Sequence, residues 1–283
     1  MNVLITGAGG MLGRDMIAAC RARGHEVVPL ARSELDICDS VAADAALTSQ
    51  RPDAVINCAA FTDVDGAEDD EAGAMRINDE GAAQLAAAAQ RVGAKILQPS
   101  SDYVFDGSAR VPYVESDMPL PISAYGRSKQ AGETSVAVAN PHHFIVRASW
   151  LFGHGGKNFV ETMLRLGGEQ PEVLVVSDQI GCPTYTRHLA EALAALVEGE
   201  EFGIHHVAGG GQCSWYEFAQ EIFDQAGVEC RVMAGTTEML ARKAPRPAYS
   251  VLGSERLEPI ALPNWRRGLA EYLAERQVAE APA

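Results

Sequence analysis

The chain has 283 residues, of which 47% are hydrophobic, so it is long enough and apolar enough to build a substantial core. Its 38 Asp and Glu residues outnumber its 23 Lys and Arg residues, and the net charge of −15 excludes a basic surface for nucleic acid. No apolar run reaches membrane-spanning length, and the N-terminus has a strand-like pattern without the charged start of a signal peptide. We therefore expect a cytoplasmic globular protein with neither nucleic acid nor a membrane as a partner.

The cysteines and histidines do not predict a metal site. The six cysteines are scattered without a C-x-x-C pair, which is typical of reduced thiols packed as small hydrophobic groups. The seven histidines have no cysteine or carboxylate nearby at ligand spacing. We expect no zinc site.

A glycine-rich turn is predicted between the first strand and the first helix. The apolar residues 3–5 are followed by glycines in the spacing G-x-x-G-x-x-G, and a helical pattern continues to Ala22. Glycine permits a sharp turn and a close approach to a pyrophosphate, which the positive end of the following helix attracts. The turn therefore predicts a dinucleotide site made by Gly7, Gly10, Met11, Leu12 and Gly13.

The end of the second predicted strand favours a particular cofactor. The strand covers residues 26–30, and Arg32 follows where many dinucleotide-binding folds have an acidic residue for the ribose hydroxyls. A guanidinium can pair with a 2′-phosphate, which an acid would repel. Arg32 therefore favours NADPH, with NADH as the alternative cofactor; the competing interpretation is that Arg32 only points into water.

Strands and helices alternate through the first half of the chain. Further strands are expected at residues 53–57 and 95–99, with a helix at 82–92 between them, and this order predicts an α/β fold with a doubly wound parallel sheet. Small residues after the third strand, in Asn57-Cys58-Ala59-Ala60, leave room for a cofactor, and residues 61–65 are expected to form a loop there.

A tyrosine and a lysine share one face of a later predicted helix. The helix begins after Pro119 and Pro121 with Ser123 as its cap, and Tyr125 and Lys129 lie one turn apart. A free phenol titrates near pH ~10, and a nearby positive charge lowers its pKa. The pair predicts a proton donor that works at neutral pH, although this spacing alone is more often a solvated helix face.

Serines stand at the end of the fourth predicted strand. Ligands of open α/β sheets bind at this carboxyl edge, so Ser101 is expected to hydrogen-bond a substrate carbonyl that Tyr125 protonates. A serine in this place is otherwise an ordinary turn or cap residue. Asn78, in an earlier helix, is a further candidate that would hold a water molecule between Lys129 and solvent.

Together these motifs resemble the extended short-chain dehydrogenases/reductases. Within that superfamily the chain is similar to the dTDP-4-dehydrorhamnose reductase family from Met1 to about Leu273. The matching runs include Thr6-Gly7-x-x-Gly10-x-x-Gly13, Ser-Ser-Asp-Tyr-Val-Phe-Asp-Gly from residue 100, Tyr125-x-x-x-Lys129, Arg147-Ala148-Ser149-Trp150, Asp178-Gln179-Ile180-Gly181-Cys182-Pro183-Thr184 and Arg246-Pro247.

The resemblance implies NADPH-dependent reduction of the C4 ketone of dTDP-4-dehydrorhamnose to dTDP-L-rhamnose. By matching position, it implies that Ser101, Tyr125 and Lys129 are catalytic. Cofactor contacts are implied for Asn57, Ala59, Ala60, Thr62, Tyr125 and Lys129 beside the glycine turn and Arg32. Substrate contacts are implied for Ser101, Asp102, Tyr103, Trp150, Asn158 and Arg246.

The second half of the chain alternates less regularly and predicts a smaller, discontinuous α/β domain for the substrate. We assign residues 1–148 and about 173–207 to a Rossmann domain that binds NADPH, and about 149–172 and 208–283 to a sugar-nucleotide domain. Helices are expected at 157–166, at 187–198 and after Ser214, and strands at 173–176 and 203–207. The basic run at 242–247 would clamp a diphosphate, or else would be a solubilising loop.

Other functions are weighed against this resemblance. A sugar 4,6-dehydratase would need a glutamate directly after Asp102, where this chain has Tyr103. A 4-ketoreductase of another dTDP-deoxysugar would share nearly all of these residues. A non-catalytic NADP-binding regulatory subunit, like the methionine adenosyltransferase β subunit, is not excluded by Tyr125 and Lys129.

One family feature is not expected here. Some members hold Mg²⁺ between subunits through glutamates, and the matching places in this chain contain Asp15, which is one methylene shorter, and Arg187, which would oppose a cation. We expect no bridging metal and a monomer or weak homodimer.

Overall fold

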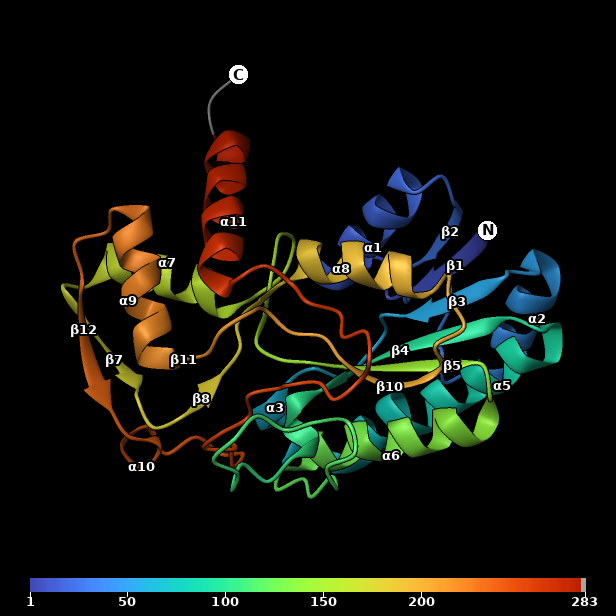
Figure 1. Ribbon diagram of the computed structural model, residues 1–283, viewed down its shortest axis with the longest axis horizontal. Helices are drawn as coiled ribbons and strands as arrows, with labels where there is room; N and C mark the ends of the chain where they lie inside the picture. The colour runs from blue at the N-terminus through green and yellow to red at the C-terminus, as the bar shows by residue number, and fades with distance from the viewer. Residues whose placement is uncertain (281–283) are drawn as a thin grey trace.

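The structure, a computed structural model, describes residues 1–280 and is built on a six-stranded parallel sheet (Figure 1). The strand order is β10-β5-β4-β3-β1-β2, so the connections change direction beside β1, where the crevice of a doubly wound sheet forms. The strands are β1 (Asn2–Thr6), β2 (Glu26–Leu30), β3 (Ala54–Asn57), β4 (Lys95–Ser101), β5 (His143–Ala148) and β10 (Gly203–His206). This order confirms the predicted fold class.

Helices cover both faces of the sheet because the strands are apolar on both sides. Val3 and Ile5 of β1 pack in one core and the intervening Leu4 packs in the other, as the alternation of side chains along a strand requires. The first core includes α1 (Met11–Ala22) and α8 (Thr186–Leu196), and the second includes α2 (Ser40–Gln50), α5 (Ala82–Val92) and α6 (Ala124–Ala139).

A second lobe, on the left in Figure 1, has its own hydrophobic core. Its centre contains Phe152, Phe218, Trp265 and Tyr272. The lobe is made mainly by α7 (Phe159–Glu169), α9 (Trp215–Ala226), α11 (Trp265–Glu280), β7 (Glu172–Val176) and β12 (Arg231–Gly235).

The pairing of β7 corrects the expected division of the chain. The sequence pattern assigns residues from 173 onward to the first domain, but β7 pairs with β12 and buries Val173 and Val175 in the core of the second lobe. The chain returns to the central sheet only with α8, which packs against α1. The last three residues assigned to the second domain lie outside the described residues.

Side-chain caps decide several element boundaries. The expected loop at 61–65 becomes helical at Val64, because the Asp63 carboxylate accepts a hydrogen bond from the Gly66 N–H. The helix expected from residue 157 begins after Asn158, which caps it. Ser214 and Glu217 form a capping box at the start of α9, as the sequence predicts for the serine.

Short elements lie between these longer ones along the chain. These are α3 (Val64–Ala67), α4 (Glu71–Met75), the π-helical turn η1 (Arg76–Gly81), the 3₁₀ turn η2 (Asp102–Val104), β6 (Leu151–Phe152), β8 (Ile180–Gly181), β9 (Thr184–Tyr185), β11 (Cys213–Ser214) and α10 (Thr237–Leu240). Within residues 1–280, no helix has the length and apolar character needed to cross a bilayer.

Candidate active site

The turn after β1 is a cradle in which two positions accept only glycine. Gly7 has a φ of +62°, and a Cβ there would lie 2.5 Å from the Ala59 nitrogen. A Cβ on Gly13 would lie 2.3 Å from the Gly7 carbonyl oxygen. No side chain caps α1 at Gly10, which leaves backbone N–H groups of its first turn available to an anion. The cradle therefore fits the pyrophosphate of a dinucleotide.

A pocket of about 220 Å³ opens beside the cradle. Of the predicted cofactor residues, it brings together Gly7, Gly10, Arg32, Ala59 and Ala60. Its remaining lining comes from Leu35, Asp36, Ile37, Cys58 and Ile77. The pocket suits the adenosine end of the cofactor, with the Arg32 guanidinium on its wall.

Other predicted cofactor residues have different surroundings. The Asn57 side chain is buried, where it accepts a hydrogen bond from Thr6 Oγ1 at 2.6 Å and donates one to Gln98 Oε1 at 2.8 Å. It therefore ties β1, β3 and β4 together. Met11 and Leu12 lie in the first turn of α1, and Thr62 is exposed before α3.

Ser101 and Tyr125 meet where β4 ends beside α6. Ser101 is the last residue of β4, and Ser123 caps α6 as predicted, with its Oγ accepting from the Gly126 N–H at 3.1 Å. The half-buried Tyr125 packs against a small cluster made by Ala67, Ala74 and Ala124, and an interaction with the Ser101 hydroxyl lowers its pKa. The start of α6 thus packs with residues that follow the cofactor strand β3 in the chain.

Lys129 is buried on the same helix, and its ammonium has a backbone partner. Nζ donates to the Pro99 carbonyl at 2.8 Å, and only 5% of the residue is exposed. Burial lowers the pKa of Lys129 to about 8, although the neighbouring Glu133 carboxylate raises it.

The predicted acidification of the phenol by this ammonium is wrong for the structure described. Burial, with a smaller contribution from the Asp102 carboxylate, raises the pKa of Tyr125 to about 12 against the lowering effect of the Ser101 hydroxyl. Helical spacing places the two side chains on one face, but the ammonium is directed to Pro99 and desolvation dominates at the phenol.

A second pocket, of about 360 Å³, extends from Tyr103 into the second lobe. The Tyr103 ring stands edge-on to Tyr125, with ring centroids 5.8 Å apart. Arg242 and Arg246 contribute positive charge to this pocket, and Trp215 contributes an aromatic wall. The other lining side chains are Phe159, Thr162, Met163, Leu166, Leu174, Val175, Val176, Gln179 and Leu240. An apolar wall opposite two guanidinium groups suits a ligand with a base at one end and a diphosphate beside it.

The basic loop predicted to clamp a diphosphate has acidic partners. Arg246 forms a two-pronged ion pair with Asp65, with N–O distances of 3.0 Å at both oxygens. Arg242 lies 3.7 Å from the same carboxylate, and Lys243 pairs with Asp69. These pairs fasten the loop to α3 and its flanking residues and hold Arg246 on the pocket wall.

Three predicted site residues have structural partners instead of facing the pocket. Trp150 stacks on Trp215, with ring centroids 3.5 Å apart. The Asn158 side chain caps α7 through Glu161 N and donates to the Gly153 carbonyl, which disfavours the predicted substrate contact. Asn78 does not hold a water between Lys129 and solvent in the predicted way, because its amide bonds both the backbone of Phe61 and Ser128 Oγ.

Asp102 is also buried, with its carboxylate directed to serine hydroxyls, and the substrate contact expected of this residue stays a prediction. Only 2% of the residue is exposed, and both carboxylate oxygens accept hydrogen bonds from serine hydroxyls. Sequence reasoning misses one of these serines, Ser250, because no local pattern marks it. It also does not single out Trp215, which follows the predicted cap Ser214 and lines the second pocket.

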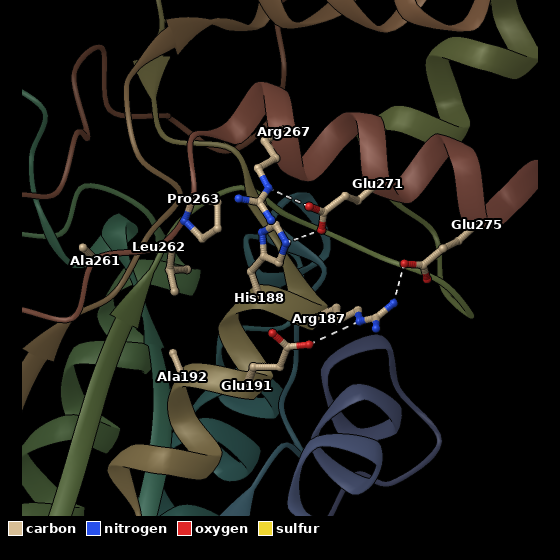
Figure 2. Close-up of a pocket in the computed structure, with 10 residues that line it drawn as sticks. All are labelled: Arg187, His188, Glu191, Ala192, Ala261, Leu262, Pro263, Arg267, Glu271 and Glu275. Carbon is tan, nitrogen blue, oxygen red and sulfur yellow. Dashed lines mark hydrogen bonds and ion pairs between the residues drawn. The ribbon is translucent and has the colours of Figure 1, made fainter. Parts of the chain in front are cut away.

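A larger charged cleft lies elsewhere, between α8, α11 and residues 261–263 (Figure 2). It measures about 500 Å³, and its charged groups pair with one another: Arg187 with Glu191 and Glu275, and both His188 and Arg267 with Glu271. None of the predicted catalytic residues lines it.

Across residues 1–280, no group of three or more His, Cys, Asp or Glu side chains is arranged to hold a metal ion.

A doubly wound sheet with a glycine cradle after β1, and a serine, tyrosine and lysine at the same edge, defines a dinucleotide-binding protein of the short-chain dehydrogenase/reductase class. The family model described as RmlD substrate binding domain matches residues 1–278. The chain belongs to this family.

Relatives of known name cover nearly the whole chain. The spore coat polysaccharide biosynthesis protein SpsK of Bacillus subtilis is 44% identical, over 98% of this chain and 99% of its own length. The dTDP-4-dehydrorhamnose reductase of Streptomyces griseus is 45% identical, over 95% and 91% of the two chains. A crystal structure of dTDP-4-dehydrorhamnose reductase from Bacillus anthracis in complex with NADP has a TM-score of 0.94 at 40% identity, covering 97% of this chain and 99% of that chain.

Proposed function

We propose that the chain reduces the C4 ketone of dTDP-4-dehydrorhamnose to dTDP-L-rhamnose with NADPH. The observation that supports this proposal is that Ser101 ends β4 beside Tyr125, and that Lys129 is buried one turn along the tyrosine's helix with its ammonium on the Pro99 carbonyl of the same strand. The glycine cradle after β1 and the pocket with two guanidinium groups add to this support. The family and the names of the relatives in Streptomyces griseus and Bacillus anthracis support the same activity.

Each residue has a role that follows from its place. NADPH supplies the hydride when bound. Tyr125, whose phenol is protonated at neutral pH, donates its proton to the oxygen that develops at C4. Lys129 is the buried cation proposed to hold the cofactor ribose, and the Ser101 hydroxyl lies beside the phenol, so the two define the position of the ketone oxygen.

Substrate recognition is assigned to the pocket between the lobes. Arg246 is held on its wall by Asp65, and we propose that it pairs with the diphosphate together with Arg242. Tyr103 joins this pocket to the catalytic edge because its ring contacts Tyr125. The dTDP-sugar is therefore the proposed small-molecule partner, and a monomer or weak homodimer stays a prediction.

The alternatives differ from this proposal in measurable ways. Purified protein is mixed with NADPH and enzymatically prepared dTDP-4-dehydrorhamnose, and loss of NADPH absorbance together with formation of authentic dTDP-L-rhamnose is expected. Turnover only with another dTDP-4-keto sugar would favour the second ketoreductase. Binding of NADPH without turnover of any such sugar would favour a regulatory subunit and contradict the proposal.

Arg32 tests the cofactor preference. Replacing Arg32 by Ala removes the guanidinium from the adenosine pocket and is expected to lower the preference for NADPH over NADH by about 10- to 100-fold, the worth of a hydrogen bond to a charged group. The measurement is the ratio of kcat/KM for the two cofactors. Arg21→Ala, at the exposed end of α1, is the matched control and is expected to leave the ratio unchanged. An unchanged ratio in Arg32→Ala would contradict the proposed contact between Arg32 and the 2′-phosphate.

A further inference from the structure

The carboxylate of Asp65 is a shared acceptor for the basic loop at residues 242–247. Its Oδ1 accepts from the Ala244 N–H and from Arg246 Nη1, each at 3.0 Å, and its Oδ2 accepts from Arg246 Nη2 at 3.0 Å. The bond from Arg246 is the first cause that lowers the pKa of Asp65, so this group is an anion at neutral pH. One carboxylate therefore fixes both the backbone of the loop and the guanidinium that the loop carries.

These contacts leave one edge of the Arg246 guanidinium for a ligand. An arginine has five N–H groups in a planar fork. Asp65 takes the two at the end of the fork, and Nη1 donates its other hydrogen to the Ala244 carbonyl at 2.9 Å. The Nε–H and the second hydrogen of Nη2 remain, and such a parallel pair is the geometry that binds a phosphate through two hydrogen bonds. Arg246 lines the second pocket, where the Tyr103 side chain interacts with the same guanidinium, so a ligand at this edge would also reach Tyr103.

The short helix that carries Asp65 is fixed to the catalytic helix. Glu68, the residue after α3, accepts a hydrogen bond at 2.8 Å from the N–H of Ala124, the first residue of α6. Tyr125 is the next residue of that helix. Asp65 therefore connects the basic loop to a helix whose position is set by the start of the catalytic helix.

We propose that Asp65 is a positioning residue for substrate binding: its carboxylate holds the end of the Arg246 fork and so presents the Nε–Nη2 edge to the diphosphate of the dTDP-sugar. The inference rests on the proposed function and adds to it a residue that acts through Arg246 and does not itself contact the substrate. The competing interpretation is that Asp65 only fastens the loop, in which case any cation at position 246 would serve.

The charge of Asp65 gives the two explanations of affinity opposite signs. An anion near a diphosphate repels it, so Asp65→Asn would bind the sugar nucleotide more tightly if charge alone determined the affinity. If the direction of the guanidinium determines the affinity, the same variant binds more weakly, because the amide nitrogen of asparagine is a donor where Arg246 requires an acceptor.

The experiment compares the wild type with Asp65→Asn in two measurements, KM for dTDP-4-dehydrorhamnose and the dissociation constant of dTDP by calorimetry. We expect both constants to rise about 10- to 100-fold, the worth of a hydrogen bond to a charged group. We expect kcat and the KM for NADPH to change less than about threefold, because the lost contact is made equally in the ground state and the transition state. An unchanged or lowered KM for the sugar nucleotide would overturn the proposal.

An exposed ion pair of the same loop provides the matched control. Asp69 pairs with Lys243, and the two side chains are 67% and 51% exposed. Asp69→Asn removes the same charge near the same loop without touching Arg246, so it is expected to leave both constants unchanged. Equal increases in Asp69→Asn and Asp65→Asn would contradict a role specific to Asp65.

Arg246→Lys separates the fork from the fastening of the loop. A lysine keeps the charge and a partner for Asp65, but its ammonium is a point charge without a second edge. We expect its KM for the sugar nucleotide to rise as in Asp65→Asn, with a urea unfolding midpoint close to that of the wild type. The double variant Asp65→Asn, Arg246→Lys is expected to lose little more than either single variant, since both disturb one contact. A wild-type KM in Arg246→Lys, or additive losses in the double variant, would overturn the proposal.

The wild type distinguishes failure of this inference from failure of the proposed function. If the wild type neither binds dTDP nor reduces the sugar nucleotide, the proposed function fails and the role of Asp65 fails with it. If the wild type does both and Asp65→Asn behaves like it, only the role of Asp65 is refuted.

Discussion

Replacing Tyr125 by Phe is expected to lower kcat for reduction of the 4-keto sugar nucleotide by about 10²- to 10⁴-fold, the usual contribution of a positioned acid. The phenyl ring keeps the packing against Tyr103 and against the cluster of Ala67, Ala74 and Ala124, so the fold and the adenosine pocket are preserved. Only the proton that moves to the C4 oxygen is lost. Steady-state turnover and NADPH binding, measured by fluorescence titration, check both parts of this result.

A matched tyrosine separates this effect from a general one. Tyr216 lies on α9, where its hydroxyl accepts a hydrogen bond from Gln220 in an exposed position. Tyr216→Phe is expected to retain wild-type kcat. Near-normal turnover in Tyr125→Phe, with Tyr216→Phe also active, would mean that another group protonates the product.

The second large effect is expected on stability, at a buried ion pair behind the catalytic helix. Arg147 of β5 is 1% exposed and donates to both Glu133 oxygens, at 2.9 and 2.7 Å. Replacing Arg147 by Met leaves the Glu133 carboxylate buried without its guanidinium partner, which is expected to lower the free energy of unfolding by about 3–5 kcal/mol. Urea denaturation of the two proteins measures the difference.

Two further variants show whether the unpaired charge is the cause. The double variant Arg147→Met, Glu133→Gln removes both charges and is expected to recover part of the lost stability. Arg165 pairs with Glu169 on the surface of α7, where the two side chains are 59% and 57% exposed, so Arg165→Met is expected to cost less than about 1 kcal/mol. Equal losses in Arg147→Met and Arg165→Met would contradict the account of the buried pair.

Much of the fold could be predicted because its signals are local. The apolar run at 26–30 coincides with β2 and the alanine-rich pattern at 82–92 coincides with α5. Pairing is not local, since an apolar strand such as β7 has the same pattern whichever strand it joins. Its partner β12 begins at Arg231, 59 residues after the start of β7 at Glu172, and nothing in the strand itself identifies it.

The candidate site was predictable in part for the same reason. Glycine spacing and the turn of a helix place Gly7, Gly13, Tyr125 and Lys129, because backbone geometry alone relates them. The partners of a side chain depend on folding. The sequence does not reveal that the Lys129 ammonium bonds Pro99 or that Asp102 is buried against Ser250, 148 residues away.

Transfer of a labelled hydride tests the proposed reaction most directly. The protein is incubated with dTDP-4-dehydrorhamnose and NADPH that carries deuterium on either face of nicotinamide C4, and the sugar product is analysed by mass spectrometry and NMR. We predict that one of the two labelled cofactors places deuterium at C4 of dTDP-L-rhamnose, one atom for each NADPH consumed. Unlabelled sugar from both cofactors, or no reduced sugar at all, would contradict the assignment of this edge of the sheet as a reductase site.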